Sequence, residues 1–157
     1  MKNFARLGAC SFLFVLVAMS GGVSRAQSTA APAVGAGVGA LSQARVFPYD
    51  QMTVTRLPNG GEMERVVQGT LKTGEAVAVH ESMQPVGIEP NPAHRIEHSE
   101  FIFVREGTVQ FEHDGKAERV EAGGVIYVAL GTMHRLRNVG KVPARYVVIA
   151  IGGDVKK

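Results

Sequence analysis

The fold is decided by residues 92–107, PAHRIEHSEFIFVREG. If this stretch is a β-strand, its side chains alternate between two faces. One face then carries two histidines and a glutamate beside aliphatic side chains: His94, Ile96, His98, Glu100, Ile102 and Val104. Ionisable groups in an apolar setting are stable only when they are paired, hydrogen-bonded or bound to a metal. The pattern therefore favours a divalent cation with nitrogen and oxygen ligands. The alternative is a histidine strand that faces solvent or is hydrogen-bonded.

Short runs of apolar and β-branched residues continue from this stretch in both directions. From residue 45 onward they are separated by turn residues, which is the pattern of β-strands. The dipeptide Asp114-Gly115 lies between two such runs and favours a hairpin turn. The predicted strands are Thr53–Leu57, Met63–Leu71, Ala76–Met83, His94–Arg105, Thr108–His113, Lys116–Val120, Val125–Val128, Met133–Val139 and Ala144–Ile151. Many short antiparallel strands predict a β-sandwich or a small β-barrel.

A second stretch with candidate chemistry is residues 123–138, GGVIYVALGTMHRLRN. Strand alternation places Leu136 and Asn138 on the same face as His134. A lone histidine on an apolar strand is often a hydrogen-bonded core residue. Here, however, only one predicted hairpin separates His134 from the first stretch, so neighbouring strands could bring the two together. A mononuclear metal site needs such convergence of ligands from separate strands.

Together the two stretches resemble the two motifs of the cupin superfamily, in particular those of small, single-domain type-2 cupins. In the first motif, the leading histidine corresponds to His94, the glutamate to Glu100 and the closing glycine to Gly107. The positions that correspond to the second motif are Gly123, Gly131, His134 and Asn138. The resemblance covers roughly Gly74–Gly152. It implies an all-β fold, a small antiparallel β-barrel of the double-stranded β-helix or RmlC-like jelly-roll type.

Three positions depart from the family's motifs. Ala129 stands where a proline is usual, and Gly124 where an acidic residue is usual. More important, Ile96 occupies the place of the second histidine and cannot bind a metal. We expect His98, the next side chain on the same strand face, to replace it from about 7 Å further along. The alternative is that His98 hydrogen-bonds to Glu100 and orients it.

The resemblance implies one divalent metal ion, Fe, Mn, Ni or Zn, in the barrel. The predicted ligands are His94, His98, Glu100 and His134. Without His98, the remaining two histidines and one carboxylate still suit Fe(II) or Mn(II).

The predicted pocket around the ligands is mostly apolar. Its expected lining residues are Ile96, Ile102, Val104, Leu136 and Asn138. Such a pocket favours a small, largely apolar organic molecule as ligand. Similar cupins include dioxygenases, isomerases, lyases and decarboxylases, so the resemblance implies a metal-dependent enzyme of one of these kinds. Because fold does not determine function, a non-catalytic domain that binds or senses a metal or small ligand is the alternative.

Two aromatic side chains point away from the predicted site. Phe101 and Phe103 lie on the opposite face of the same strand, where we expect them to pack against a second sheet or a subunit partner. Cupins that resemble this chain are commonly dimers, so the resemblance implies a homodimer.

The first residues, Met1–Ala26, have the pattern of a secretory signal peptide. Lys2 and Arg6 precede an apolar run that is shorter than the ~20 residues of a membrane-spanning helix. Small residues at positions 24 and 26 fit a cleavage site, so we expect a soluble protein exported to the periplasm or outside the cell. The small, uncharged residues 27–44 read as a flexible linker, and residues 45–157 as the β-domain.

Removal of this segment would leave a protein of zero formal net charge and without cysteine. Three of the 17 basic residues and none of the 14 acidic residues lie in it, so the remaining formal charge is zero. The sequence pI of about 9.2 therefore does not indicate nucleic-acid binding. The one cysteine, Cys10, also lies in this segment, so the exported chain would form no disulfide.

Overall fold

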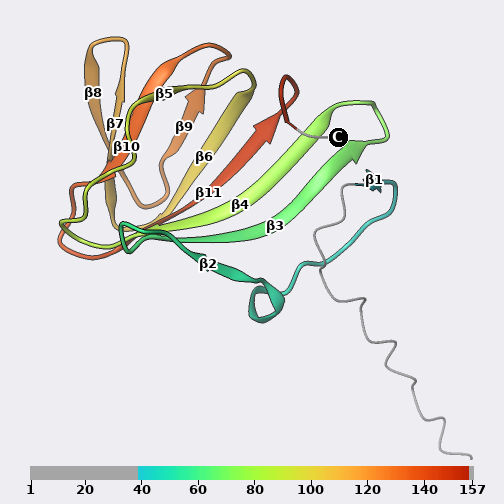
Figure 1. The fold of residues 1–157 in the computed structure, drawn as a ribbon, viewed down its shortest axis with the longest axis horizontal. Helices are drawn as coiled ribbons and strands as arrows, with labels where there is room; N and C mark the ends of the chain where they lie inside the picture. The colour runs from blue at the N-terminus through green and yellow to red at the C-terminus, as the bar shows by residue number, and fades with distance from the viewer. Residues whose placement is uncertain (1–38, 156–157) are drawn as a thin grey trace, which may run out of the picture. The chain divides into compact units, whose positions relative to one another are not determined.

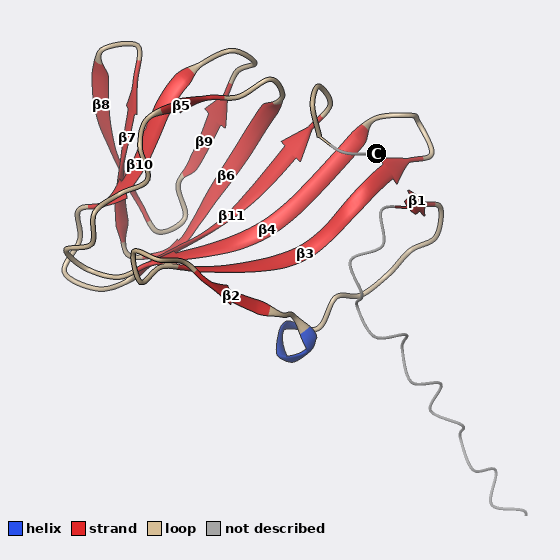
Figure 2. Ribbon diagram, in the orientation of Figure 1, coloured by secondary structure: helices blue, strands red, loops and turns tan. Residues whose placement is uncertain are grey.

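Two β-sheets make up the described part of the chain, which is residues 39–155 of the computed structural model (Figure 1). The strands of the larger sheet are β1 (Gly39–Leu41), β2 (Val54–Arg56), β3 (Glu62–Leu71), β4 (Ala76–Gln84), β6 (Ser99–Glu106), β9 (Val125–Val128) and β11 (Ala144–Ile151). The strands of the smaller sheet are β5 (His94–Arg95), β7 (Thr108–His113), β8 (Lys116–Glu121) and β10 (Met133–Asn138). One short 3-10 helix, η1 (Tyr49–Gln51), precedes β2 (Figure 2).

From β4 onward the chain passes back and forth between the two sheets, except that the hairpin of β7 and β8 stays in the smaller one. β4, β6, β9 and β11 belong to the larger sheet, and β5, β7, β8 and β10 to the smaller one. All strand pairs are antiparallel except that of β1 with β3. This interleaving is that of a double-stranded β-helix, so the predicted jelly-roll fold class is confirmed. Within residues 39–155, hydrogen bonds do not join the two sheets into a closed barrel.

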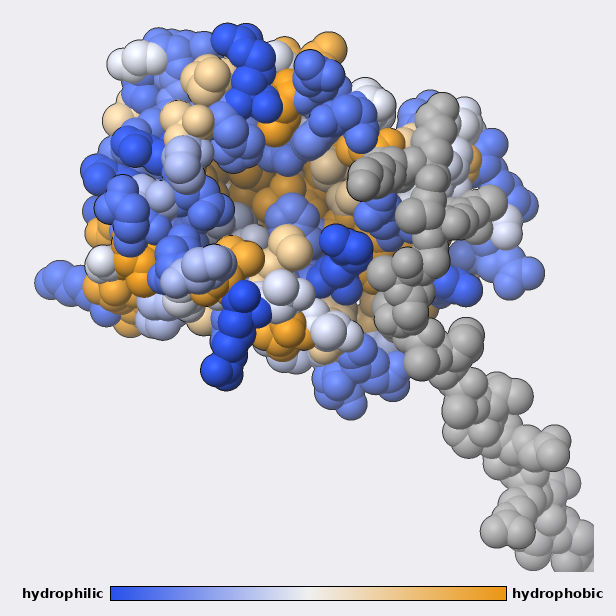
Figure 3. Space-filling model, viewed as in Figure 1, coloured by the Kyte–Doolittle hydropathy of each residue, from blue (hydrophilic) through white to orange (hydrophobic). Residues whose placement is uncertain are grey.

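The core lies between the two sheets because each strand buries every second side chain. In β11 the buried positions alternate strictly from Ala144 to Ala150. The main cluster of buried side chains contains Ile96, Ile102, Val104, Val109, Phe111, Ile126, Val128, Leu136, Ala144, Tyr146 and Val148. In the view of Figure 3, hydrophobic residues gather in the hollowed middle of this face, and hydrophilic residues surround them.

One predicted strand is in fact two. The prediction of a continuous strand over His94–Arg105 is wrong, because the chain leaves the smaller sheet after Arg95 and enters the larger one at Ser99. β5 pairs with β10, whereas β6 pairs with β11 and β9. The three residues 96–98 form the crossover between the sheets, and the candidate ligands therefore come from both sheets.

Glycines occupy several corners at which the chain changes sheet. Gly107, Gly123 and Gly131 have φ values of 74°, 89° and 82°, a left-handed conformation that glycine adopts at little cost. At Gly107, an added Cβ would lie 2.7 Å from the carbonyl oxygen of Pro143 and 2.9 Å from Cα of Ala144. Gly107 is therefore required both by its φ and by the close approach of the chain that enters β11.

The amino-terminal predictions fall mostly outside the described residues. The signal peptide and the linker up to residue 38 lie there and remain predictions. Residues 39–41, which the sequence assigned to the linker, form β1 and pair in parallel with Gly69–Leu71 of β3. In the part of the chain that the structure describes, no helix is long and apolar enough to cross a membrane.

The corner at Gly107 can be tested against a glycine with the same φ and free space. Gly115, in the β7–β8 turn, has a φ of 75°, and an added Cβ there would meet no atom within 4 Å. We expect Gly115→Ala to cost about 1 kcal/mol of unfolding free energy through backbone strain alone. Gly107→Ala should cost about 1–3 kcal/mol more, because the added methyl group overpacks the corner. Urea unfolding of both variants measures the difference, and equal losses would contradict the proposed steric role of Gly107.

Candidate functional site

Two of the predicted ligands, His94 and His134, face each other across β5 and β10. They are partners in the strand register, and their ring centroids are 4.6 Å apart. The Nδ1 atom of His94 lies 3.3 Å from the carbonyl oxygen of Pro92, and that of His134 lies 3.2 Å from the carbonyl oxygen of Thr132. Since a carbonyl can only accept, both Nδ1 atoms donate a proton. The lone pair of each neutral ring is therefore on Nε2, the arrangement in which a histidine binds a metal.

The environment of His134 favours the neutral form of its ring. Its side chain is 4% exposed, and this burial lowers its pKa. The hydrogen bond to the Thr132 carbonyl acts in the opposite direction but is the smaller effect. His134 therefore offers an unprotonated Nε2 at neutral pH.

The other two predicted ligands, His98 and Glu100, contact each other at the start of β6. Nε2 of His98 is 2.9 Å from Oε1 of Glu100, and its Nδ1 is 2.6 Å from Oδ1 of Asp154. Burial lowers the pKa of His98, but its hydrogen bonds to Asp154 and Glu100 outweigh burial and raise it above the ordinary value. Oε2 of Glu100 lies 3.9 Å from Nε2 of His134. The carboxylate of Glu100 thus lies between His98 and His134.

The donor atoms fit a divalent ion by their chemistry, although they do not converge on one point. Two Nε2 lone pairs and a carboxylate are ligands that Fe, Mn, Ni and Zn accept. Within residues 39–155, however, no three His, Cys, Asp or Glu side chains are arranged so that they could hold an ion. The contact between His98 and Glu100 is the one expected if His98 orients Glu100. The choice between ligand and orienting residue stays a prediction.

The predicted pocket-lining residues are packed into the core. Ile96, Ile102, Val104 and Leu136 all belong to the main buried cluster between the sheets. The side-chain amide of Asn138 donates to the backbone carbonyls of Gln84 and Val142, and its oxygen accepts from the Gly140 backbone. Asn138 therefore holds the turn between β10 and β11. A role for these residues in ligand binding stays a prediction.

An open depression of about 650 Å³ reaches the candidate site from the hairpin end of the smaller sheet. Ala93, Met133 and His134 line it on the side of the candidate ligands. Residues from β7, β8 and their turn, among them His113 and Asp114, also line it. His134 can therefore be reached from outside although its side chain is buried.

Two polar residues near the site, His80 and Asp154, were not predicted from the sequence. His80 of β4 is the register partner of buried Val148, so it faces the interior, and burial lowers its pKa while the charge of Glu100 opposes this. Strand alternation puts His80 on the same face of β4 as Ala76 and Ala78, and this pattern could have predicted that its side chain points inward. Asp154 lies in the carboxyl-terminal segment, 56 residues after His98, and no local pattern connects the two.

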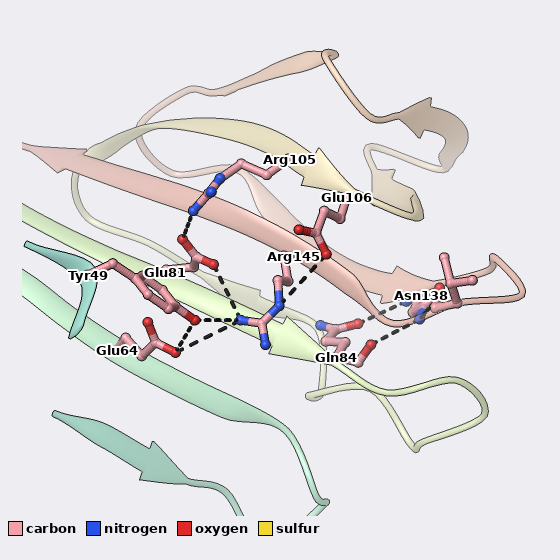
Figure 4. Close-up of polar contacts among 9 residues, drawn as sticks. Tyr49, Glu64, Glu81, Gln84, Arg105, Glu106, Asn138 and Arg145 are labelled. Carbon is pink, nitrogen blue, oxygen red and sulfur yellow. Dashed lines mark hydrogen bonds and ion pairs between the residues drawn. The ribbon is translucent and has the colours of Figure 1, made fainter. Parts of the chain in front are cut away.

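A second polar cluster, also missed, lies on the other face of the larger sheet (Figure 4). Glu64 and Glu81, 4% and 5% exposed, are cross-strand neighbours on β3 and β4. Arg145 of β11 donates to Glu81 over 3.4 Å and to the Tyr49 hydroxyl over 3.3 Å, and Tyr49 donates to Glu64 over 3.2 Å. Arg105 also donates to Glu81. Two buried carboxylates are thus compensated mainly by two arginines.

Comparisons with known proteins agree with this architecture. Residues 79–150 match the family model described as a cupin domain. Among solved structures, the fold is similar to a predicted oxalate decarboxylase from Thermotoga maritima, with 20% identity over 68% of this chain and 98% of the other and a TM-score of 0.54. It is also similar to an RmlC-like cupin from Shewanella frigidimarina, with 16% identity, 71% and 95% coverage and a TM-score of 0.56.

A third similar structure is KdgF from Halomonas sp., with 13% identity, 73% and 96% coverage and a TM-score of 0.55. Among curated proteins, no sequence matches the chain significantly. At these identities the structural matches show the fold alone. The chain therefore has the cupin fold, and residues 79–150 are similar in sequence to the cupin domain.

The buried carboxylates on the outer face predict a large effect for Arg145. We expect Arg145→Met to lower the free energy of unfolding by about 3 kcal/mol, because it leaves Glu64 and Glu81 without their shared cation. A matched control is Arg56→Met, since Arg56 is 86% exposed and forms a 3.5 Å ion pair with Glu62. Its loss should cost less than about 1 kcal/mol. Similar unfolding midpoints for the two variants in urea would contradict a stabilising role for the Arg145 cluster.

Proposed function

We propose that this chain, on the basis of its cupin fold, binds one divalent metal ion through His94, Glu100 and His134 and acts on a small organic molecule. The observation that carries the proposal is the hydrogen-bond geometry of the two facing histidines. Each places Nδ1 against a backbone carbonyl and leaves Nε2 for another partner, and the partly buried carboxylate of Glu100 lies 3.9 Å from Nε2 of His134. Such hydrogen bonds orient histidine ligands in metal sites.

His98 completes the proposed site in one of two ways. As a fourth ligand, it would turn Nε2 from Glu100 toward the ion. As an orienting residue, it would keep the 2.9 Å hydrogen bond to Glu100. In both cases Nδ1 of His98 keeps its hydrogen bond to Asp154, so Nε2 is the atom that contacts the ion or Glu100.

The ion, Fe, Mn, Ni or Zn, would supply Lewis acidity or activation of oxygen when bound. The chain's own residues would orient the reactants and exclude water. His134 and Glu100, with side chains 4% and 12% exposed, form the inner wall, and the depression beside His134 offers a path for a small molecule. We expect dioxygenase, isomerase or lyase chemistry on a largely apolar substrate.

A non-catalytic binding or sensing role is the second candidate, and one observation favours it. Ile96, Ile102, Val104 and Leu136, which were expected to line a substrate cavity, pack against each other and against the rest of the core. Metal-loaded protein that turns over neither oxidisable phenolics nor keto acids would support this second role.

We also propose that the protein is exported, to the periplasm or outside the cell, and that Gln27 is its first mature residue. The proposal depends on the charge and hydrophobicity pattern of Met1–Ala26, which lie outside the described residues.

The proposed metal site predicts which substitutions abolish metal binding. Wild-type protein should bind one equivalent of Mn²⁺, Ni²⁺ or Zn²⁺, measured by elemental analysis and chelator competition. Glu100→Gln and His134→Ala should lose most of this binding because each removes a ligand. His113→Ala is the matched control, since His113 is the register partner of His134 on β7 but is held by Glu118 and Asp114.

His98→Ala separates the two roles of His98. Loss of most metal binding identifies it as a ligand, whereas a weakening of about 10–100-fold identifies it as the residue that orients Glu100. If Glu100→Gln and His134→Ala load as much metal as wild type, the proposed site is wrong.

For the quaternary structure we propose a homodimer formed through the outer faces of β6 and β9. Phe101, Phe103, Val125 and Tyr127 are 39 to 57% exposed and are paired in register, Phe101 with Tyr127 and Phe103 with Val125. The rings of Phe101 and Tyr127 are 5.1 Å apart. Clustered apolar side chains on an exposed sheet face are typical of a protein interface.

The dimer face is tested by placing a charge in its middle. We expect sedimentation velocity to show a dimer for wild type and a monomer for Phe103→Glu, because the buried charge would lack a partner. Val142→Glu, at a loop residue that is 54% exposed, should remain dimeric. A monomeric wild type, or a dimeric Phe103→Glu, would contradict this interface.

A further inference from the structure

The carboxyl-terminal segment after β11 docks onto the crossover between β5 and β6. The backbone N–H of Gly152 donates to the carbonyl of Ala76 over 2.8 Å, and that of Asp154 donates to the carbonyl of Glu97 over 3.2 Å. Val155 is buried in a small cluster with Ala76 and Ala150. Backbone and side-chain contacts therefore fix this segment on the protein.

The docking brings two backbones into direct contact at Gly153. Its φ is +54°, and an added Cβ would overlap the carbonyl of Glu97 and lie 2.9 Å from Cα of His98. Only glycine allows this approach without a shift of the backbone. The next residue, Asp154, is thereby placed within reach of the His98 ring.

Asp154 begins a line of four polar side chains that leads from the surface to the buried site. Its Oδ1 accepts from Nδ1 of His98 at 2.6 Å, and Nε2 of His98 lies 2.9 Å from Oε1 of Glu100. Oε2 of Glu100 lies 3.9 Å from Nε2 of His134. Side-chain exposure falls along this line, from 54% for Asp154 to 16%, 12% and 4% for the others.

We propose that Asp154 is a positioning residue of the metal site, acting through His98. A histidine held at one nitrogen only can rotate or flip its ring, and a carboxylate on Nδ1 removes this freedom. With the ring held, His98 presents Nε2 to Glu100 and restricts the orientation of that carboxylate. This inference rests on the proposed metal-binding function. It adds to the site a residue that lies outside both sequence motifs.

The chain offers a matched control for this role. Asp114 accepts from Nδ1 of His113 at 3.2 Å, and Nε2 of His113 lies 2.6 Å from Glu118, so the two histidines have the same kinds of partner. Asp114 and His113 are outside the proposed ligand set. Asp154→Asn and Asp114→Asn thus remove the same charge from equivalent ring nitrogens.

Two measurements test the proposal, with Zn²⁺ as the probe for metal binding. We expect Asp154→Asn to change the ¹⁵N chemical shift of Nδ1 of His98 in metal-free protein. It should also weaken Zn²⁺ binding about 10–100-fold in chelator competition. Asp114→Asn should change only the signals of His113 and leave Zn²⁺ affinity at the wild-type value. Urea unfolding of both variants reports any purely structural effect.

The outcomes separate this inference from the function on which it rests. If Asp154→Asn is less stable than wild type but binds Zn²⁺ equally well, Asp154 only anchors the carboxyl-terminal segment, and the proposal is wrong. Unchanged His98 signals in Asp154→Asn would also overturn it, whatever the metal affinity. If wild type binds no divalent metal while the His98 signals respond to Asp154→Asn, the contact is real but the metal-binding function fails.

Discussion

The rest of the structure depends on how the chain crosses between the two sheets. At each crossover it must end its hydrogen bonds with one sheet and begin those with the other within a few residues. In β11 every second side chain is buried, and these side chains can form one core only if the strands of both sheets face each other. Glycines at Gly107, Gly123 and Gly131 supply left-handed corners at three crossovers. The crossover at residues 96–98 has no glycine, and it brings His98 and Glu100 toward β10.

Buried charge is compensated in different ways on the two faces of the larger sheet. At the crossover into β6, His98 lies between the carboxylates of Asp154 and Glu100 and contacts both. On the outer face, Glu64 and Glu81 share Arg145, and Arg105 adds a second cation. A buried charge without a partner costs more than an ion pair contributes, so each arrangement depends on all its members. The outer cluster supports the sheet, whereas the interior line ends at the candidate ligand His134.

The cupin fold is compatible with many functions, so a function for this chain must be argued from the site. In this chain the distinguishing features are the isoleucine at position 96, the histidine at 98 and the contact of that histidine with the carboxyl-terminal segment. Ile96 packs in the hydrophobic core, so the polar contacts of this segment are made by His98 and Glu100. The proposed site therefore depends on residues from both sheets and from the end of the chain.

The sequence predicted the all-β fold class and most of the strands and turns from residue 53 onward. Alternation and turn residues are local properties, and for this reason Thr108–His113, Val125–Val128 and Ala144–Ile151 agree with the observed strands. The sequence indicated only that neighbouring strands could bring the two motifs together, and the register pair of His94 with His134 came from the structure. Only the tertiary structure decided that the strand breaks after Arg95, because side chains on both sides of the break keep the alternating pattern. It alone joined Asp154 to His98, since a contact across 56 residues depends on how the strands pair and where the last turn docks.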